Sequence, residues 1–323
     1  MTSARTEWKT AGTGTPWFFP AISSVKTNYS VLQYAALLNS MGAERYLVSA
    51  YDLGRMAVGE RDAVLGLLRE AEGRGCAVLL DSGNYESYWK GDRSWTQSDF
   101  HAVAQDTACS LVFSFDKQVP GDGVYAIVAK VVEGALRDTA ALGDRGLVCP
   151  VIHGDPDVLP EVCVEVAQAL RPLMVAVPER ELGSGIYERA ASVRRISVAL
   201  SSVTPCPRLH LLGTGNPLSL LVFAACGAGS FDGLEWCQTC ADHTTGRLYH
   251  FQHYDFFSYQ TPLGATPELS FPAAALAHNL IFFSEWMARV SDANDEGRLR
   301  ELLRQYMPPG ALEGLEARVE GAF

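Results

Sequence analysis

The sequence predicts an α/β fold in which a single (β/α)8 TIM barrel spans residues 1–323. Short apolar runs alternate with amphipathic segments along almost the whole chain, and about eight such repeats favour a closed barrel over an open sheet. Four of the apolar runs end on a polar side chain, and these end residues are Asp81, Asp116, His153 and Asp232. Because the carboxyl ends of parallel barrel strands surround one pocket, we expect these four side chains to meet there.

Eight strands are expected from the apolar runs, at residues 17–19, 45–50, 77–81, 111–116, 147–153, 173–177, 208–212 and 229–232. Helical periodicity predicts helices at 31–41, 62–72, 99–107, 123–142, 159–170, 272–290 and 296–306. Asp99 is expected to be the N-cap of the third helix. The aromatic and histidine-rich stretch 237–266 interrupts the alternation and is predicted to be a small insertion or subdomain over one rim, followed by C-terminal helices.

Composition excludes several classes of protein. The net charge of -11 argues against broad nonspecific binding of nucleic acid, although a local basic groove remains compatible with it. The N-terminus is polar and no apolar stretch approaches the length of a membrane span, so we expect a soluble, cytoplasmic protein without a membrane partner. The eight cysteines lie mostly within apolar runs, which indicates reduced, buried thiols.

Six segments, in the same order along most of the chain, resemble the tRNA-guanine transglycosylase superfamily. Residues 81–85 (DSGNY) are similar to its Asp-Ser-Gly-Gly-aromatic motif, and 211–217 (LLGTGNP) with 231–232 resemble the signature around its nucleophile. Residues 15–26, 115–116 and 278–283 resemble its opening strand, its second aspartate and its late helix. The pair 153–154 (HG) stands where the family usually has Gln-Gly, so this chain is identified as a divergent member.

The resemblance implies catalytic roles for two carboxylates. Asp232 would be the nucleophile, because displacing a base from an anomeric carbon passes through an oxocarbenium-like state that a carboxylate can capture. Asp81 would give a proton to the departing base and take one from the incoming base. The alternatives are structural: Asp232 as a loop or N-cap residue, and Asp81 as a turn aspartate that caps Ser82 and Gly83.

Other positions would bind the base. Asp116 would accept hydrogen bonds from the donor edge of a guanine-like base, while His153 and the Gly154 amide would meet its carbonyl edge. A histidine there, unlike glutamine, can become charged, and it could equally be a structural histidine. Tyr85 and Leu212 match positions that sandwich the base in the family, with ordinary core packing as the alternative.

Two further positions belong to the predicted substrate site. Gly213 lies within the signature around the nucleophile. Glu179, with Glu181, could recognise an amine or guanidine-like substituent on the 7-position of the base. Equally, Glu179 and Arg180 could pair with neighbouring side chains.

The expectation for zinc is divided. Family members usually carry Cys-x-Cys-x-x-Cys and a later histidine, and here the usual three-cysteine motif is absent although His278 remains. We expect loss of the metal, with a relocated zinc site as the alternative. The candidate ligands of such a site are Cys237, Cys240, His243, His250 and His253.

The sequence thus predicts a pentosyltransferase that replaces guanine in a polynucleotide with a 7-deazaguanine derivative, through a covalent aspartyl-glycosyl intermediate. The reduced pattern resembles that of relatives that insert deazaguanines into DNA, which favours DNA or another unusual acceptor over tRNA. The alternative is a non-catalytic deazaguanine- or nucleic-acid-binding subunit of a modification or defence complex, and a nucleoside-type hydrolase is a third reading. A partner protein or a homodimer is compatible with each of these alternatives.

Overall fold

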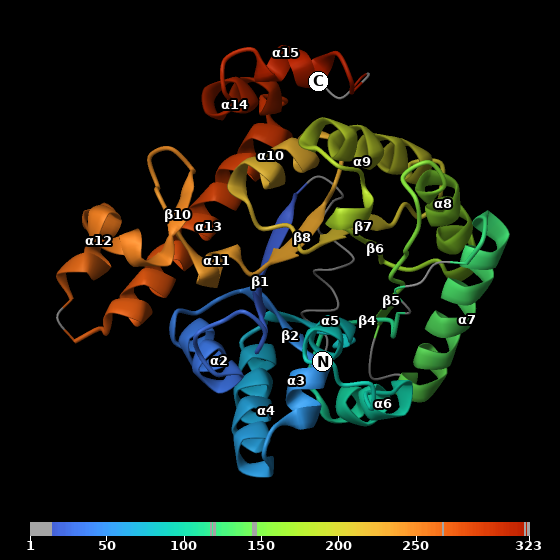
Figure 1. Cartoon of the computed structure of the whole chain (residues 1–323), viewed down its shortest axis with the longest axis horizontal. Coiled ribbons are helices and arrows are strands. Elements are labelled where there is room, and N and C mark those ends of the chain that lie inside the picture. The colour runs from blue at the N-terminus through green and yellow to red at the C-terminus, as the bar shows by residue number, and fades with distance from the viewer. Residues whose placement is uncertain are drawn as a thin grey trace.

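The computed structural model describes residues 15–116, 118, 121–143, 147–266, 268–319 and 321. Its centre is a sheet of eight parallel strands, surrounded by a ring of helices (Figure 1). The strand order is β5-β4-β3-β2-β1-β8-β7-β6, so the first and last repeats of the chain meet where β1 pairs with β8. The strands are β1 (Trp17–Ile22), β2 (Arg45–Ser49), β3 (Ala77–Asp81), β4 (Leu111–Phe113), β5 (Val148–Cys149), β6 (Met174–Pro178), β7 (Arg208–Leu212) and β8 (Ser230–Gly233).

Main-chain hydrogen bonds just beyond β5 close the sheet. Ile152 N–H donates to the Ala176 carbonyl at 2.8 Å, and Ala176 N–H donates to the Pro150 carbonyl at 3.0 Å. Pro150 has no N–H of its own, and strand β5 is correspondingly short. These contacts complete the (β/α)8 TIM barrel that the sequence predicts.

The period-two alternation of the strands divides the core into two layers. One set of side chains fills the inside of the barrel, among them Phe19, Leu79, Phe113 and Met174. The other set faces outward and packs beneath the surrounding helices. The barrel interior is therefore solid, and ligands can be admitted only at its ends.

All seven predicted helices form, with shifted boundaries. The helices of the barrel are α2 (Val31–Ser40), α3 (Ala50–Arg55), α4 (Val58–Gly73), α5 (Asn84–Trp89), α6 (Gln97–Asp106), α7 (Val124–Leu142), α8 (Leu159–Leu170), α9 (Ile186–Leu200) and α10 (Pro217–Ala225). The prediction of Asp99 as an N-cap is wrong. Thr96 is the N-cap of α6, and Asp99, the third residue of the helix, completes the capping box.

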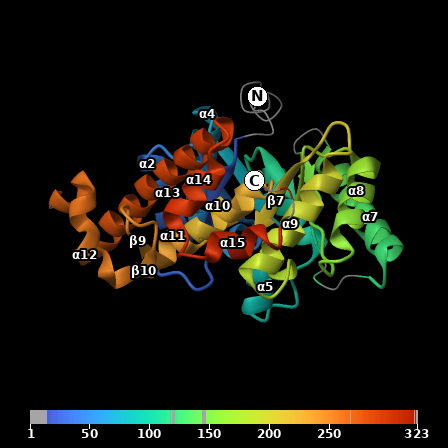
Figure 2. The ribbon, with the colours of Figure 1, turned by 90° about the horizontal axis from the view of Figure 1, so that it is seen from above.

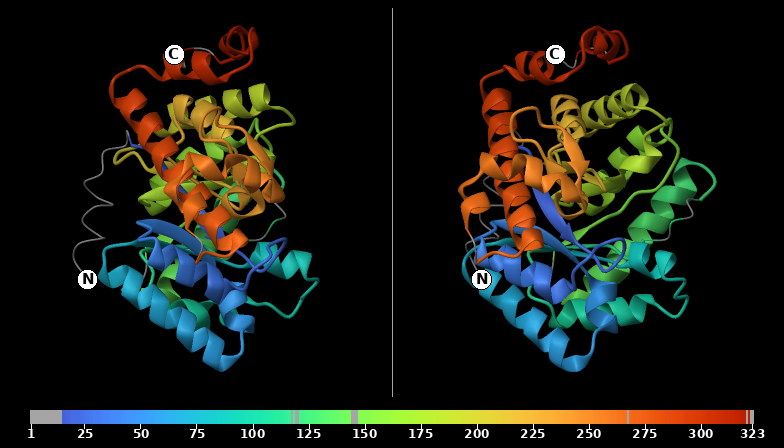
Figure 3. Two further views of the ribbon diagram at one scale, coloured as in Figure 1. Left: turned by 90° about the vertical axis from the view of Figure 1, so that its left-hand side faces the viewer. Right: turned by 60° about the vertical axis from the view of Figure 1, so that its left-hand side comes forward.

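After β8 the chain leaves the alternating pattern. It forms α11 (Glu235–Gln238), a hairpin of β9 (Thr239–Ala241) and β10 (Leu248–His250), and α12 (Tyr254–Phe257). Viewed from above, α12 lies at the end of the molecule opposite α7 (Figure 2). The long helix α13 (Phe271–Asp295) runs along one side of the barrel (Figure 3). Glu296 is its C-cap rather than the start of the next helix, which is α14 (Leu299–Tyr306), followed by α15 (Ala311–Glu316).

No helix in the described ranges combines the length and the apolar character that crossing a lipid bilayer requires.

Asn279 joins α13 to the segment after β8. Its side chain is fully buried; it accepts from Ala241 N–H at 2.9 Å and donates to the carbonyls of Trp236 and Thr239 at 2.7 and 2.6 Å. Asn279→Ala would leave these buried groups without partners, and we expect the free energy of unfolding to fall by about 3 kcal/mol. Urea unfolding would measure it, with Ser284→Ala on the exposed face of α13 as the control. An unfolding midpoint equal to that of the control would contradict the assignment.

Candidate active site

A cavity of about 460 Å³ opens at the carboxyl ends of the strands. Its volume is in the range that small-molecule sites occupy. Eight of the nine predicted site residues line it: Asp81, Tyr85, Asp116, His153, Glu179, Leu212, Gly213 and Asp232. They come from six different repeats of the barrel, and only the strand-end convergence brings them together.

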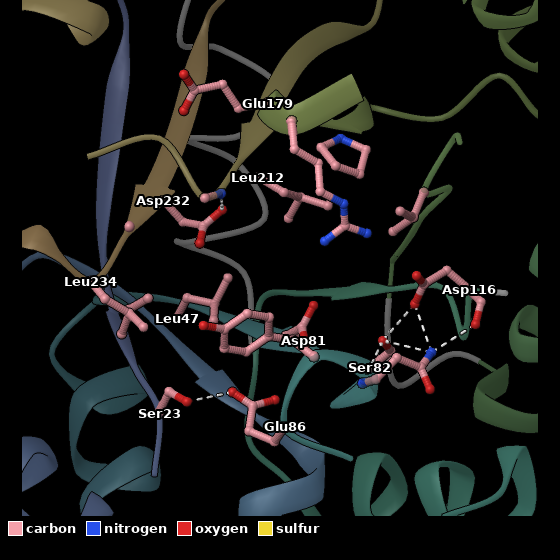
Figure 4. Close-up of a pocket in the computed structure, with 18 of the residues that line it drawn as sticks. Ser23, Leu47, Asp81, Ser82, Glu86, Asp116, Glu179, Leu212, Asp232 and Leu234 are labelled. Carbon is pink, nitrogen blue, oxygen red and sulfur yellow. Dashed lines mark hydrogen bonds between the residues drawn. The ribbon is translucent and has the colours of Figure 1, made fainter. Parts of the chain in front are cut away.

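Asp232 lies on β8, and its carboxylate is held at one oxygen. Gly213 N–H donates to Oδ1 at 3.2 Å, and His210 Nε2 lies 3.0 Å from the same atom. His210 is fully buried and its Nδ1 lies 2.8 Å from Ser230 Oγ, which fixes the ring. The carboxylate is thereby oriented, and Asp232 points into the same open space as Asp81 (Figure 4).

Asp81 ends strand β3, and Gly83 N–H donates to its Oδ2 at 2.9 Å. Burial, reinforced by the nearby charges of Glu86 and Asp116, raises the pKa of Asp81 well above its ordinary value. The carboxyl group therefore favours its protonated form, which a general acid needs.

Gly83 is required by the turn after Asp81. Its φ is +84°, and a Cβ there would lie 2.4 Å from Tyr51 Cβ, so any side chain would collide with α3. The close approach lets α5 begin immediately and brings Tyr85 and Glu86 to the cavity.

Glu86 is a cavity residue that the sequence analysis missed. It is buried and accepts from Ser23 Oγ at 2.6 Å and Ser49 Oγ at 2.8 Å. Burial, together with the charge of Asp52, raises its pKa to about 7. The only sequence signal was an acidic residue shortly after the DSG motif, in a helix too short for periodicity to reveal.

His153 lies between two carboxylates. Its Nε2 is 2.8 Å from Asp116 Oδ2 and its Nδ1 is 2.6 Å from Glu181 Oε1. Burial alone lowers the pKa of His153, but the hydrogen bonds and charges of Asp116 and Glu181 outweigh it and raise the pKa to about 9. Because carboxylates only accept, both ring nitrogens donate and the side chain is an imidazolium at neutral pH.

Asp116 is the most fully coordinated of the cavity carboxylates. Besides His153, Ser82 Oγ donates to its Oδ1 at 2.8 Å and Asn84 Nδ2 at 2.7 Å. Burial raises its pKa, yet these donors and the charge of His153 prevail, so the pKa of Asp116 is lowered and the group stays ionised. A carboxylate has about four acceptor positions, and three are occupied here.

Three of the predicted base contacts are already engaged within the protein. Gly154 N–H donates to Glu181 Oε2 at 3.0 Å, and Gly154 is the one predicted site residue that does not line the cavity. Glu179 pairs with Arg189 at 2.9 Å and accepts from Thr214 Oγ1 at 3.0 Å. His153 likewise has both ring nitrogens occupied, so a base carbonyl would find no free donor on His153 or on the Gly154 amide.

The candidate zinc ligands are not arranged to hold a zinc ion. His278 is fully buried and donates from Nε2 to the Ala241 carbonyl at 2.8 Å, while its Nδ1 lies 3.4 Å from Thr261 Oγ1. Burial lowers its pKa to about 4. Among the residues that the structure describes, no group of three or more histidine, cysteine, aspartate or glutamate side chains is arranged to hold a metal ion.

Asp138 on α7 fixes the position of Asp116 from outside the cavity. It is fully buried; its Oδ2 accepts from Phe115 N–H at 2.7 Å, and its Oδ1 contacts Gln97 Nε2 at 2.6 Å and His101 Nε2 at 2.7 Å. One side chain thus ties the end of β4 to α6 and α7.

We expect Asp138→Asn to weaken binding of guanine, the ligand that the sequence predicts, by about tenfold, because an amide cannot accept from all three donors and Asp116 shifts. Isothermal titration calorimetry with guanine would measure it. Asp106→Asn, at the exposed end of α6, is the control. Unchanged affinity in a folded Asp138→Asn protein would contradict the positioning role.

The charge of His153 predicts a pH dependence of stability. Its folded-state pKa of about 9 exceeds its ordinary value of 6.5, so its stabilisation is complete below pH 6.5 and is lost as the pH rises through 9. The full loss is on the order of 3 kcal/mol, at about 1.4 kcal/mol for each pKa unit. Urea unfolding of wild type and His153→Gln at several pH values would show their difference shrinking over this window. An NMR titration placing the His153 pKa at 6.5 or below would refute it.

Known proteins similar to this chain belong to the family that its motifs resemble. No protein-family model matches the chain. The tRNA-guanine(15) transglycosylases of Methanosarcina acetivorans, Methanosarcina barkeri and Methanosarcina mazei are each 22% identical to it over 309, 309 and 305 residues. Each match covers 86% of this chain, which spans 60% of the length of these curated relatives. The chain is therefore a divergent relative of the tRNA-guanine transglycosylases, as its motifs predict.

Proposed function

We propose that this protein is a base-exchange pentosyltransferase that replaces guanine in a polynucleotide with a 7-deazaguanine derivative. The observation that carries the proposal is the pair formed by Asp232 and Asp81, which face one cavity of about 460 Å³ from β8 and β3. Asp232 is oriented by hydrogen bonds to one oxygen, and Asp81 is held toward its protonated form. An oriented nucleophile opposite an acid is what displacement at an anomeric carbon requires.

The reaction runs in two balanced steps. First, Asp232 forms a bond to the anomeric carbon while the bond from that carbon to N9 of guanine breaks, and Asp81 supplies the proton to the departing base. In the second step the incoming base gives its proton to Asp81, its nitrogen bonds to the anomeric carbon, and the Asp232 ester is released. Asp81 ends as it began, so no co-reactant is consumed.

The base is held by the remaining cavity residues. Asp116 has one acceptor position left for an N–H of the base, and Tyr85 and Leu212 provide an aromatic ring and an aliphatic side chain at the cavity wall. Because Glu179 is paired with Arg189, recognition of an amine on the 7-position would require that ion pair to open. Arg180 also lines the cavity and lies 3.8 Å from Glu181, but a guanidinium only donates hydrogen bonds and cannot accept one from an amine.

DNA and tRNA are the two acceptors that this proposal allows. The relatives are tRNA enzymes by name, which favours tRNA. The chain, however, spans only 60% of their length, and its described residues hold no group of side chains arranged to bind a metal ion. We therefore keep DNA, the acceptor that the reduced sequence pattern favours, as the first polymer to test.

Exchange of radiolabelled guanine and of 7-deazaguanines into double-stranded DNA and tRNA tests the function. We expect Asp232→Ala to abolish exchange and also the covalent protein–nucleic acid adduct seen on a denaturing gel. Asp81→Asn should slow exchange by roughly 10²–10⁴-fold, the usual contribution of general acid–base catalysis. Asp157→Ala, which changes an exposed aspartate that does not line the cavity, is the control.

Three other results of the exchange assay would contradict the proposed function. Tight binding of the free base without exchange or adduct in wild type would favour the binding-subunit alternative. Irreversible release of free base would instead identify a hydrolase. Exchange that persists in Asp232→Ala would remove the proposed nucleophile.

A further inference from the structure

Three aromatic side chains of α5 form a continuous surface from the cavity to the outside of the protein. Tyr85 lines the cavity, Trp89 is 51% exposed and Tyr88 is 69% exposed. The ring centroids of Tyr85 and Trp89 are 6.3 Å apart, and those of Tyr88 and Trp89 are 5.7 Å apart, both edge to face. We call these three residues the aromatic platform. Large aromatic side chains left this exposed are a feature of binding surfaces.

Basic side chains border the aromatic platform. Lys26 Nζ lies 3.7 Å from the centroid of the Trp89 ring, and Lys26 also lines the cavity. Its φ of +58° is a left-handed backbone conformation that a lysine rarely adopts, and such conformations cluster at functional sites. Lys90 follows at the end of α5, where its Nζ lies 3.8 Å from Asp52 Oδ1, and Arg93 is exposed just beyond it.

This arrangement has the chemistry of a single-stranded nucleic-acid site. Such sites combine stacking rings with cations that follow the phosphate backbone. The protein carries a net charge of -11, yet Lys26 lines the cavity that holds Asp81 and Asp232, and Lys90 and Arg93 follow the same helix that carries the aromatic platform. A phosphodiester chain complements this group of charges, whereas it would be repelled by the acidic surface as a whole.

We propose that the aromatic platform holds the nucleotides that flank the target guanosine. A flanking base stacks on Trp89 and Tyr88 while the target base enters the cavity past Tyr85, and Lys26, Lys90 and Arg93 contact the backbone phosphates. This inference rests on the proposed function for the identity of the target base. It adds a contact surface for the polymer that extends from Tyr85 at the cavity to the exposed rings of Tyr88 and Trp89.

Equilibrium binding tests the platform without requiring turnover. The first probe is a fluorescein-labelled single-stranded oligonucleotide with one central guanine. The second probe has the same sequence with abasic sites on both sides of the guanine. Fluorescence anisotropy measures the binding of each probe. We expect Trp89→Ala to raise the Kd for the normal oligonucleotide by about tenfold, a typical loss for one stacked base. The abasic version should bind wild type about tenfold more weakly and should not distinguish wild type from Trp89→Ala.

Two controls separate stacking from folding. Trp89→Phe retains a ring and should bind within about twofold of wild type. Tyr259→Ala removes an exposed aromatic residue that lies outside the cavity lining, and should leave the Kd unchanged. Binding of free guanine should be the same in wild type and Trp89→Ala, because Trp89, unlike Tyr85, does not line the cavity.

The outcomes for the platform and for the proposed function are distinguishable. An unchanged oligonucleotide Kd in Trp89→Ala, an equal loss for normal and abasic probes, or no oligonucleotide binding by wild type would overturn the platform. Absence of base exchange despite the expected binding pattern would overturn the transferase activity and leave the platform standing. With active wild type, Trp89→Ala should raise KM for the polymer about tenfold with kcat little changed.

Discussion

The enclosure of several carboxylates in one cavity is the constraint on which the rest of the site depends. An isolated ionised carboxylate out of water is costly, so each one must be paired, hydrogen-bonded or protonated. The structure uses all three solutions. Asp116 accepts hydrogen bonds from Ser82, Asn84 and His153. Glu179 is paired with Arg189, and Asp81 favours its protonated form. The different environments therefore give chemically similar side chains different roles: Asp81 can act as an acid, while Asp116 stays an anion.

The supporting contacts extend this division of roles into the barrel. Glu86, hydrogen-bonded by serines from β2 and the loop after β1, contributes negative charge that raises the pKa of Asp81. On the other side of the cavity, Asp138 holds the backbone next to Asp116. The protonation of Asp81 and the position of Asp116 are therefore both influenced by other residues of the barrel, Glu86 and Asp138.

The sequence was sufficient for the barrel and for the residues at strand ends, because apolar runs ending on polar groups follow directly from a solid barrel interior with one open rim. Asp81, Asp116, His153 and Asp232 could be placed together on that basis. Their partners could not, because Glu181 lies 28 positions from His153 and Asp138 lies 23 positions from Phe115, and no local pattern relates such pairs. The short helix α5 escaped for another reason: six residues are too few to show a helical period.

The histidine at position 153 changes how the site can read a base. A glutamine amide, usual at this position in the family, is neutral and can both donate and accept, so it can turn toward a ligand at little electrostatic cost. The imidazolium of His153 instead binds Asp116 and Glu181 together, and Glu181 in turn accepts from the Gly154 amide. Turning any one of these groups toward a base carbonyl would leave a buried charge without its partner, which costs far more than one neutral hydrogen bond contributes. The network therefore fixes Asp116 firmly for the donor edge of the base, and the carbonyl edge must be recognised by other groups of the cavity.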